Sequence, residues 1–123
     1  MSKFVMRRVP SGVKFDLTAG NGEVIASSEV YASENACRNG IASVRKNAPA
    51  ASIDDGTGDT AAKVSCPKFE IFTDKRGAFR FRLKASNGQI IATSEGYSAK
   101  ASCISGIDSV RKNAADAETA SAE

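Results

Sequence analysis

The chain has 123 residues, of which 41% are hydrophobic and 25% are charged, and its formal net charge is +3. This composition is typical of a globular chain that forms one compact domain or two very small ones. Histidine is absent, which removes the commonest general base and the commonest neutral metal ligand. No apolar run reaches membrane-spanning length and the first residues lack a signal-peptide core, so we expect a cytoplasmic protein without a membrane partner.

The sequence contains the same unit twice. When the chain is shifted by 66 residues, residues 14–48 align without a gap on residues 80–114, and 19 of 35 positions are identical. We therefore expect a first repeat at residues 1–48, a linker at 49–65 with a short strand near Ile53, a second repeat at 66–114, and a disordered tail at 115–123. The repeats are basic, whereas the linker and the tail are acidic.

Three strands are predicted at the start of each repeat. Residues 4–8 and 69–73 form the first strand, and a turn then leads to a strand at 13–19 or 79–85, where apolar and polar residues alternate. An Asn-Gly pair follows, which favours a hairpin because both residues accept a positive φ. The turn residues are Asn21, Gly22, Asn87 and Gly88, and the third strands are predicted at 23–28 and 89–94.

The period then changes to that of a helix, at residues 33–47 and 98–113. Ser33 and Ser98 are suitable N-cap residues. Gly40 and Gly106 lie in mid-helix on the apolar side, where glycine costs about 1 kcal/mol relative to alanine. We interpret them as sites where the helix approaches the sheet closely.

These elements predict an α+β fold. A single unit of this size buries too little apolar surface to be stable alone, so the two should share one core. We expect one domain with pseudo-two-fold symmetry, in which two β-β-β-α(-β) repeats form an antiparallel sheet with the helices packed on one face.

The repeated residues also resemble those of a known family, the YegP-like proteins, also called DUF1508 or UPF0339. The resemblance implies tandem β(3)-α-β repeats that build one sheet and exchange their C-terminal strands, and it implies no reaction. Residues 115–123 show no convincing counterpart of the final strand. The pattern is carried by Phe81, Leu83, Ala85, Asn87, Gly88, Ile90, Ile91, Ala92, Ser94, Glu95, Tyr97, Cys103, Gly106, Ile107, Ser109, Val110, Asn113 and Ala114.

Few residues are candidates for catalysis or metal binding. Cys37 and Cys103 lie on the apolar helix face, where we expect buried structural thiols, and nothing near Cys66 suggests a reactive one. The loop containing Asp54, Asp55 and Asp59 lacks the ligand spacing of a calcium site. We therefore expect no enzymatic activity, no metal and no cofactor.

A second set of polar residues recurs between the third strand and the helix. These residues could form a site, but we favour a helix-entry clasp, with the carboxylates capping backbone N–H groups and the rings packing on the core. The set consists of Glu29, Tyr31, Glu95 and Tyr97.

The exposed side of the second repeat is the best candidate for a binding surface. It combines basic residues with an aromatic one, as nucleic-acid platforms do, although basic residues are also common on an ordinary solvated sheet face. We expect a non-enzymatic binding or interaction module whose partner the sequence does not identify; a protein partner and self-association are both compatible with it, and a weak nucleic-acid-binding protein and a structural homo-oligomer are the alternatives. The surface comprises Phe72, Lys75, Arg76, Arg80, Arg82 and Lys84.

Overall fold

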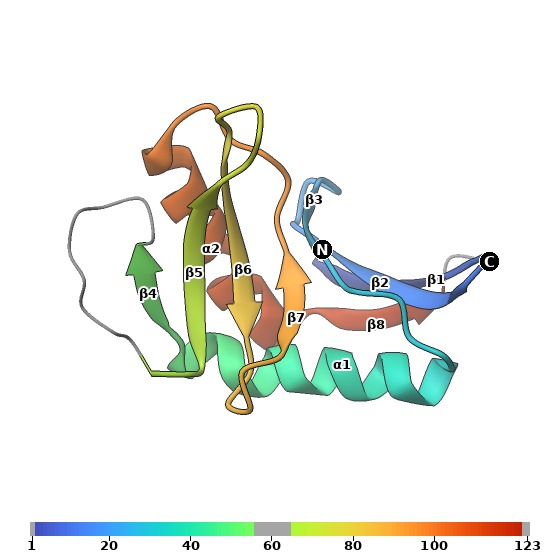
Figure 1. Ribbon diagram of the computed structural model, residues 1–123. Coiled ribbons are helices and arrows are strands. Elements are labelled where there is room, and N and C mark those ends of the chain that lie inside the picture. The colour runs from blue at the N-terminus through green and yellow to red at the C-terminus, as the bar shows by residue number, and fades with distance from the viewer. Residues whose placement is uncertain (1, 56–64, 122–123) are drawn as a thin grey trace.

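The computed structural model describes residues 2–55 and 65–121, and both repeats fold as α+β units (Figure 1). The linker residues 56–64, which include Asp59 of the loop considered above for calcium, lie outside the described residues. The elements are β1 (Lys3–Val9), β2 (Gly12–Thr18), β3 (Val24–Ser27), α1 (Glu34–Asn47), a 3₁₀ turn (Ala48–Ala50), β4 (Ser52–Asp55), β5 (Lys68–Thr73), β6 (Phe79–Lys84), β7 (Ile90–Thr93), α2 (Lys100–Asp116) and β8 (Glu118–Ser121).

The described strands form one eight-stranded sheet with the order β4-β5-β6-β7-β3-β2-β1-β8. Replacing each strand by its counterpart in the other repeat reverses this order, as the predicted pseudo-two-fold relation requires. The six inner strands are antiparallel, whereas β4 and β8 run parallel to β5 and β1. The halves meet through the register pair Ser27–Thr93, and their strands run in different directions in Figure 1.

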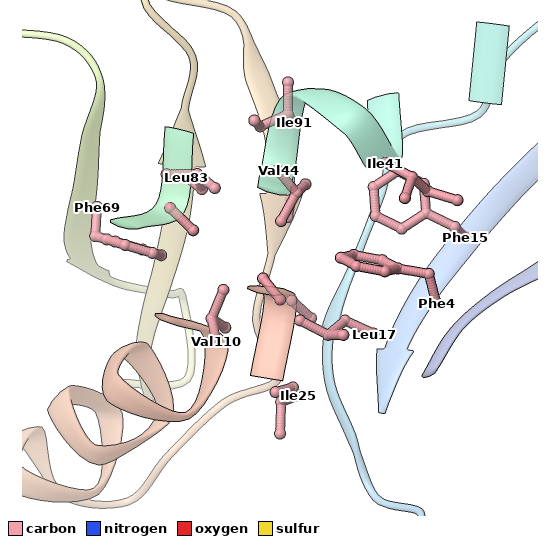
Figure 2. Close-up of a cluster of buried hydrophobic side chains, with 14 of the residues drawn as sticks. Phe4, Phe15, Leu17, Ile25, Ile41, Val44, Phe69, Leu83, Ile91 and Val110 are labelled. Carbon is pink, nitrogen blue, oxygen red and sulfur yellow. The ribbon is translucent and has the colours of Figure 1, made fainter. Parts of the chain in front are cut away.

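Both helices pack on the same face of the sheet and contact each other. α1 contacts β2 and β7, and α2 contacts β6 and β3, so each helix reaches strands of both repeats. The apolar side chains of the strands and helices join in one core, as Figure 2 shows. Because the two repeats share this core, neither one buries its apolar face by itself. Neither described helix covers the opposite face of the sheet, which we call the open face.

The turns and caps differ in detail from their prediction. Gly22 and Gly88 have positive φ angles of 86° and 84°, but no described non-glycine residue has a positive φ, so the expectation for Asn21 and Asn87 was wrong. These asparagines instead accept a hydrogen bond from the backbone N–H two residues on, at 3.0 Å. Each side chain therefore stabilises its turn directly.

Only one of the two predicted N-caps is correct. The Ser33 side chain accepts a hydrogen bond from Ala36 N at 3.1 Å. At α2 the N-cap residue is Ala99 rather than Ser98, and it makes no side-chain capping bond. The first repeat places serine where the second places alanine, so α2 begins without this stabilisation.

The expectation of a disordered tail without a final strand was wrong for residues 115–121. α2 continues to Asp116, and Glu118–Ser121 form β8 beside β1. Ser52–Asp55 form β4 at the place where Ile53 suggested a strand, and β4 pairs with β5. The strand that follows each helix therefore completes the half-sheet of the other repeat. The tail escaped prediction because β8 is stabilised by contacts with β1 rather than by apolar periodicity.

Candidate binding surface on the open face of the sheet

The polar residues of β5 and β6 lie on the open face, opposite the helices. They alternate with Phe69, Ile71, Phe81 and Leu83, which are fully buried on the helix side. The strand register places Glu70 opposite Arg82, Lys68 opposite Lys84, and Phe72 opposite Arg80. We call the cations of this surface, together with Phe72 and the two basic residues of the β5–β6 turn, the cationic face: Lys68, Phe72, Lys75, Arg76, Arg80, Arg82 and Lys84.

Glu70 lies at the centre of an ion-pair network on this face. Arg82 Nε donates to Glu70 Oε1 at 2.6 Å, and Lys84 Nζ donates to Oε2 at 3.3 Å. Lys68 Nζ lies 3.7 Å from Glu70 Oε2 and donates to Asp54 Oδ2 of β4 at 2.7 Å. The network therefore extends across β4, β5 and β6 and holds the basic side chains in defined positions.

Phe72 supports one of these cations rather than offering a free aromatic surface. The Arg82 guanidinium lies over the Phe72 ring, 4.5 Å from its centroid, in a cation–π contact. Nearer the turn, Arg80 Nε lies 3.4 Å from Asp74 Oδ2. Asp74 Oδ1 also accepts hydrogen bonds from the backbone of Arg76 and Ala78, which orders the turn.

In two ion pairs of the cationic face, Arg82–Glu70 and Arg80–Asp74, the cation is more exposed than the carboxylate. The Arg82 side chain is 33% exposed against 17% for Glu70, and the Arg80 side chain is 36% exposed against 23% for Asp74. Glu70 and Asp74 thus lie beneath Arg82 and Arg80, whereas Lys68 is less exposed than Asp54, so an approaching partner meets positive charge first at the two arginines. Six cations surround three carboxylates (Asp54, Glu70 and Asp74), so the surface keeps a positive excess.

The charges of the network also shift two pKa values. Burial alone would raise the pKa of Glu70, but hydrogen bonds from Arg82 and Lys84 outweigh it and leave that pKa below its usual value. The hydrogen bond to Asp54 raises the pKa of Lys68. Both shifts favour the charged forms, so Glu70 and Lys68 are ionised at neutral pH.

The turn residues Lys75 and Arg76 complete the cationic face. Both are exposed and lie between β5 and β6. Within residues 2–55 and 65–121 neither side chain forms an ion pair. They are therefore the cations most available to a partner.

The sequence predicted every cation of this face except Lys68, and it missed the carboxylates that hold them. Glu70 alternates with Phe69 and Ile71, and this spacing could have placed it on the same face as Arg82. Asp54 could not have been found in this way, because it reaches the surface only through the exchange of β4. The predicted basic stripe is therefore a layered network of charges.

The open face of the first repeat is less charged. Arg7 Nε donates to Asp16 Oδ2 at 2.9 Å, and the Ser27 hydroxyl donates to the other Asp16 oxygen at 2.6 Å. Val5 occupies the position that corresponds to Glu70, so the described residues of this half form no equivalent network. The two halves of the open face thus differ in their carboxylates as well as in their cations.

The recurrent tyrosines explain the mid-helix glycines. A Cβ atom at Gly40 would overlap the ring and hydroxyl of Tyr31, and one at Gly106 would overlap Tyr97. Tyr31 also stacks on Phe15, with ring centroids 6.3 Å apart. Each helix therefore makes a close approach at its glycine, to a tyrosine ring and, at Gly106, also to Phe81 of β6, and the ring part of the clasp is a packing feature.

Buried serines, rather than the glutamates, make the specific hydrogen bonds at this corner. Ser28 Oγ accepts from Phe15 N at 2.9 Å and donates to the backbone oxygen of Glu29 at 2.7 Å. Ser94 makes the same bonds with Phe81 and Glu95 at 2.9 and 2.8 Å. The Glu29 and Glu95 side chains are exposed, and capping by their carboxylates stays a prediction. The serines are identical in both repeats, a signal that sequence reasoning overlooked.

The remaining chemistry is sparse in the part of the chain that the structure describes. Cys37 and Cys103 are fully buried, and burial raises the pKa of the Cys37 thiol, which makes it less reactive. No group of three or more acidic, cysteine or histidine side chains gathers into a metal site among the described residues. Neither described helix has the length and apolarity required to cross a membrane.

The fold and surface define a two-repeat α+β protein with an exchanged strand at each sheet edge, and comparison with known proteins gives its family. The model of the family described as "Domain of unknown function (DUF1508)" matches residues 12–55 and 74–120. The chain belongs to this family. The two matched segments agree with the tandem repeat.

Individual relatives support this assignment. A UPF0339 protein of Bordetella pertussis is 39% identical over 116 residues, which cover 94% of this chain and 91% of that protein. A UPF0339 protein of Treponema denticola is 66% identical over 50 residues, which cover 41% of this chain and 86% of that shorter protein. The solution NMR structure of yegP from E. coli, described as of unknown function, is 34% identical with a TM-score of 0.80, covering 98% of this chain and 92% of that one.

Proposed function

We propose that the protein is a non-enzymatic interaction module that binds an acidic segment of a partner protein through the cationic face. The observation that carries this proposal is the layering of charge, with Arg80 and Arg82 above Asp74 and Glu70. Side chains held in this way lose little conformational freedom on binding, so less of the interaction energy is spent on ordering them.

The geometry favours a protein partner over a nucleic acid. Platforms for single-stranded nucleic acid stack bases on exposed aromatic rings. Phe72 is the aromatic residue of the cationic face, and Arg82 covers its ring. Binding to phosphates alone is compatible with the surface, but the mixed charges of Glu70 and Asp74 oppose a uniform polyanion more than a peptide of mixed composition.

The structure weakens the motive for the homo-oligomer alternative that was based on a missing final strand. β8 is present and pairs with β1, so this edge of the sheet is not left open by a missing strand. Self-association by another route is considered below.

Charge reversal at the turn tests the proposal. Lys75→Glu/Arg76→Glu reverses two charges and lowers the net charge of the cationic face by four without removing an ion pair among the described residues, and Lys3→Glu/Lys14→Glu makes the same change on the other half of the sheet. Binding is measured by fluorescence anisotropy with a labelled Asp/Glu-rich peptide and, separately, with a single-stranded RNA oligonucleotide, at low and physiological salt. Pulldown from lysate, with and without nuclease, complements this assay and uses the unmodified protein, the turn variant and the control variant.

We expect the turn variant to lose at least about tenfold in peptide affinity, as the loss of two close charge pairs implies, and the control variant to lose much less. Equal losses in both variants would show that only net charge matters and would overturn the assignment to this face. Tight RNA binding with weak peptide binding, or captured proteins that disappear with nuclease, would favour the nucleic-acid alternative.

A further inference from the structure

The two exchanged strands occupy equivalent positions at the two edges of the sheet. β4 pairs with β5 and β8 pairs with β1, each through four register pairs. An arginine near the end of each helix holds the segment that precedes the strand. Arg111 Nη2 donates to Ala51 O at 2.5 Å, and Arg45 Nη2 donates to Ala117 O at 2.6 Å. The backbone attachment is therefore nearly the same at both edges.

Side chains fasten β4 more firmly than β8. Ile53 of β4 packs against the core, and Asp54 forms the 2.7 Å ion pair with Lys68. The corresponding residues of β8 are Thr119 and Ala120. Thr119 accepts a 3.1 Å hydrogen bond from Arg45 but buries less apolar surface than isoleucine does, and alanine forms no ion pair. β8 is thus the weaker of the two edge strands.

The helix ends also differ. α1 stops at Asn47, and Pro49 in the following 3₁₀ turn prevents the helix from continuing. The position that corresponds to Pro49 is Ala115, and α2 continues through it to Asp116, directly before β8. Residues 114–123 are mostly alanine with acidic residues and no proline, and alanine is the best helix former. The composition of the β8 segment is therefore compatible with a continuation of α2.

We propose that β8 is a displaceable strand, and that the β1 edge it covers accepts β8 from a second copy of this chain. Ala117 is the hinge, because a change from its extended conformation (φ −67°, ψ 133°) to a helical one would carry β8 away from β1. This inference rests on the sheet edge and is independent of the cationic face.

A second copy is the occupant that the contacts support best. Every contact that β8 makes with Arg45 and β1 within one chain is restored when the β8 of another chain takes its place. Reciprocal exchange between two chains therefore costs little beyond the entropy of association, and it becomes more populated as concentration rises. The equivalent exchange at β4 is opposed by Pro49, Ile53 and the Asp54–Lys68 ion pair.

The first experiment uses the unmodified chain and compares its two edges by amide hydrogen exchange. We expect the amides of β1 that face β8 to exchange at least about tenfold faster than the amides of β5 that face β4, because local opening requires less free energy at the weaker edge. Equal rates at both edges, or faster exchange in β5, would overturn the proposal that β8 is displaceable.

The second experiment detects β8 of one chain on β1 of another. Val5 and Ala120 are register partners, so one chain carries Val5→Cys, another carries Ala120→Cys, and both carry Cys66→Ser to remove the partly exposed native thiol. The chains are mixed at high concentration and oxidised. A chain with both new cysteines is the positive control, since its internal disulfide shows that the geometry permits the bond.

We expect a disulfide-linked heterodimer of the two single-cysteine chains whose yield rises with concentration. Ala115→Pro, which copies Pro49, should lower that yield several-fold. If the control chain closes its internal disulfide but the mixed chains give no heterodimer, reciprocal exchange is excluded. An unchanged yield in a folded Ala115→Pro protein would exclude extension of α2 as the opening step.

Discussion

The two halves of the sheet share their core but differ on the open face and at the edge. Phe15 and Phe81 occupy equivalent core positions, and the same buried serine bonds support each of them. In contrast, Glu70 of β5 corresponds to Val5 of β1, and Ile53 of β4 corresponds to Thr119 of β8. The duplicated copies thus keep the same residues at the centre of the shared core, whereas residues of the open face and of the edge strands differ. If the function belongs to one half of the sheet, we expect its residues at the positions where the two halves differ.

The largest expected effect tests whether the two cores are equivalent. Ile41→Ala and Ile107→Ala remove side chains that are 2% and 0% exposed at matched positions of α1 and α2. Each should reduce the free energy of unfolding by about 2–5 kcal/mol, the usual result for such cavities. Urea denaturation measures both variants. Because one core serves both repeats, each variant should unfold in a single transition, and separate transitions would contradict the shared core.

Removal of the buried serine hydroxyl should have the next largest effect. Ser28→Ala and Ser94→Ala each leave a buried backbone N–H without its acceptor, at Phe15 and Phe81. We expect each to cost about 1–3 kcal/mol in the free energy of unfolding. Replacement by threonine keeps the hydroxyl and serves as the control. Equal losses of unfolding free energy in the two variants would show that the buried serine has the same structural role in both repeats. A loss in only one variant would show that the two repeats are not equivalent at this corner.

The carboxylate network of the second half predicts a specific pH dependence. The folded-state pKa of Glu70 lies below its unfolded value, so its stabilisation is complete above the unfolded pKa and is lost as the pH falls through the folded pKa. Glu70→Gln should therefore lower stability at neutral pH by about 1 kcal/mol, as expected for a partly exposed ion-pair network. The difference from the unmodified protein should shrink in acid.

Urea midpoints measured between neutral and acidic pH test this expectation. The control Glu34→Gln removes a carboxylate from the exposed Glu34–Arg38 ion pair of α1 and should change stability by only about 0.5 kcal/mol or less. If Glu70→Gln and the unmodified protein keep a constant difference at all pH values, Glu70 is not the source of the acid sensitivity.

The smallest expected effect concerns the two edge strands. Thr119→Ile gives β8 the residue that β4 carries at the corresponding position, Ile53. The added apolar contact should raise stability by less than about 1 kcal/mol, since the hydrogen bond from Arg45 to the threonine hydroxyl is lost. Hydrogen exchange should nevertheless slow in β1 and leave β5 unchanged. Slowing in both strands would indicate a global gain rather than a firmer β8.

Local patterns predicted much of the fold because the strands and helices carry strong periodicity. The alternation in residues 79–85 and the helical spacing around Ile41 and Ile107 both match the structure. β8 was missed because Glu118–Ser121 contain no apolar alternation, and their strand conformation depends on pairing with β1. Arg80, Arg82 and Lys84 of the candidate surface were predicted from alternation in β6, but Lys68 was not, and their carboxylate partners come together only in the folded sheet.

The sequence by itself determined the duplication, the α+β class and the side of each strand that faces the core, because these follow from periodicity and turn chemistry within short segments. Tertiary structure alone decided the exchange of β4 and β8, the placement of Asp54 beside Lys68, and the fit of the Tyr31 ring against Gly40. These contacts join residues that are distant in sequence or belong to different elements. Their geometry is set by packing around a common core, which no local pattern records.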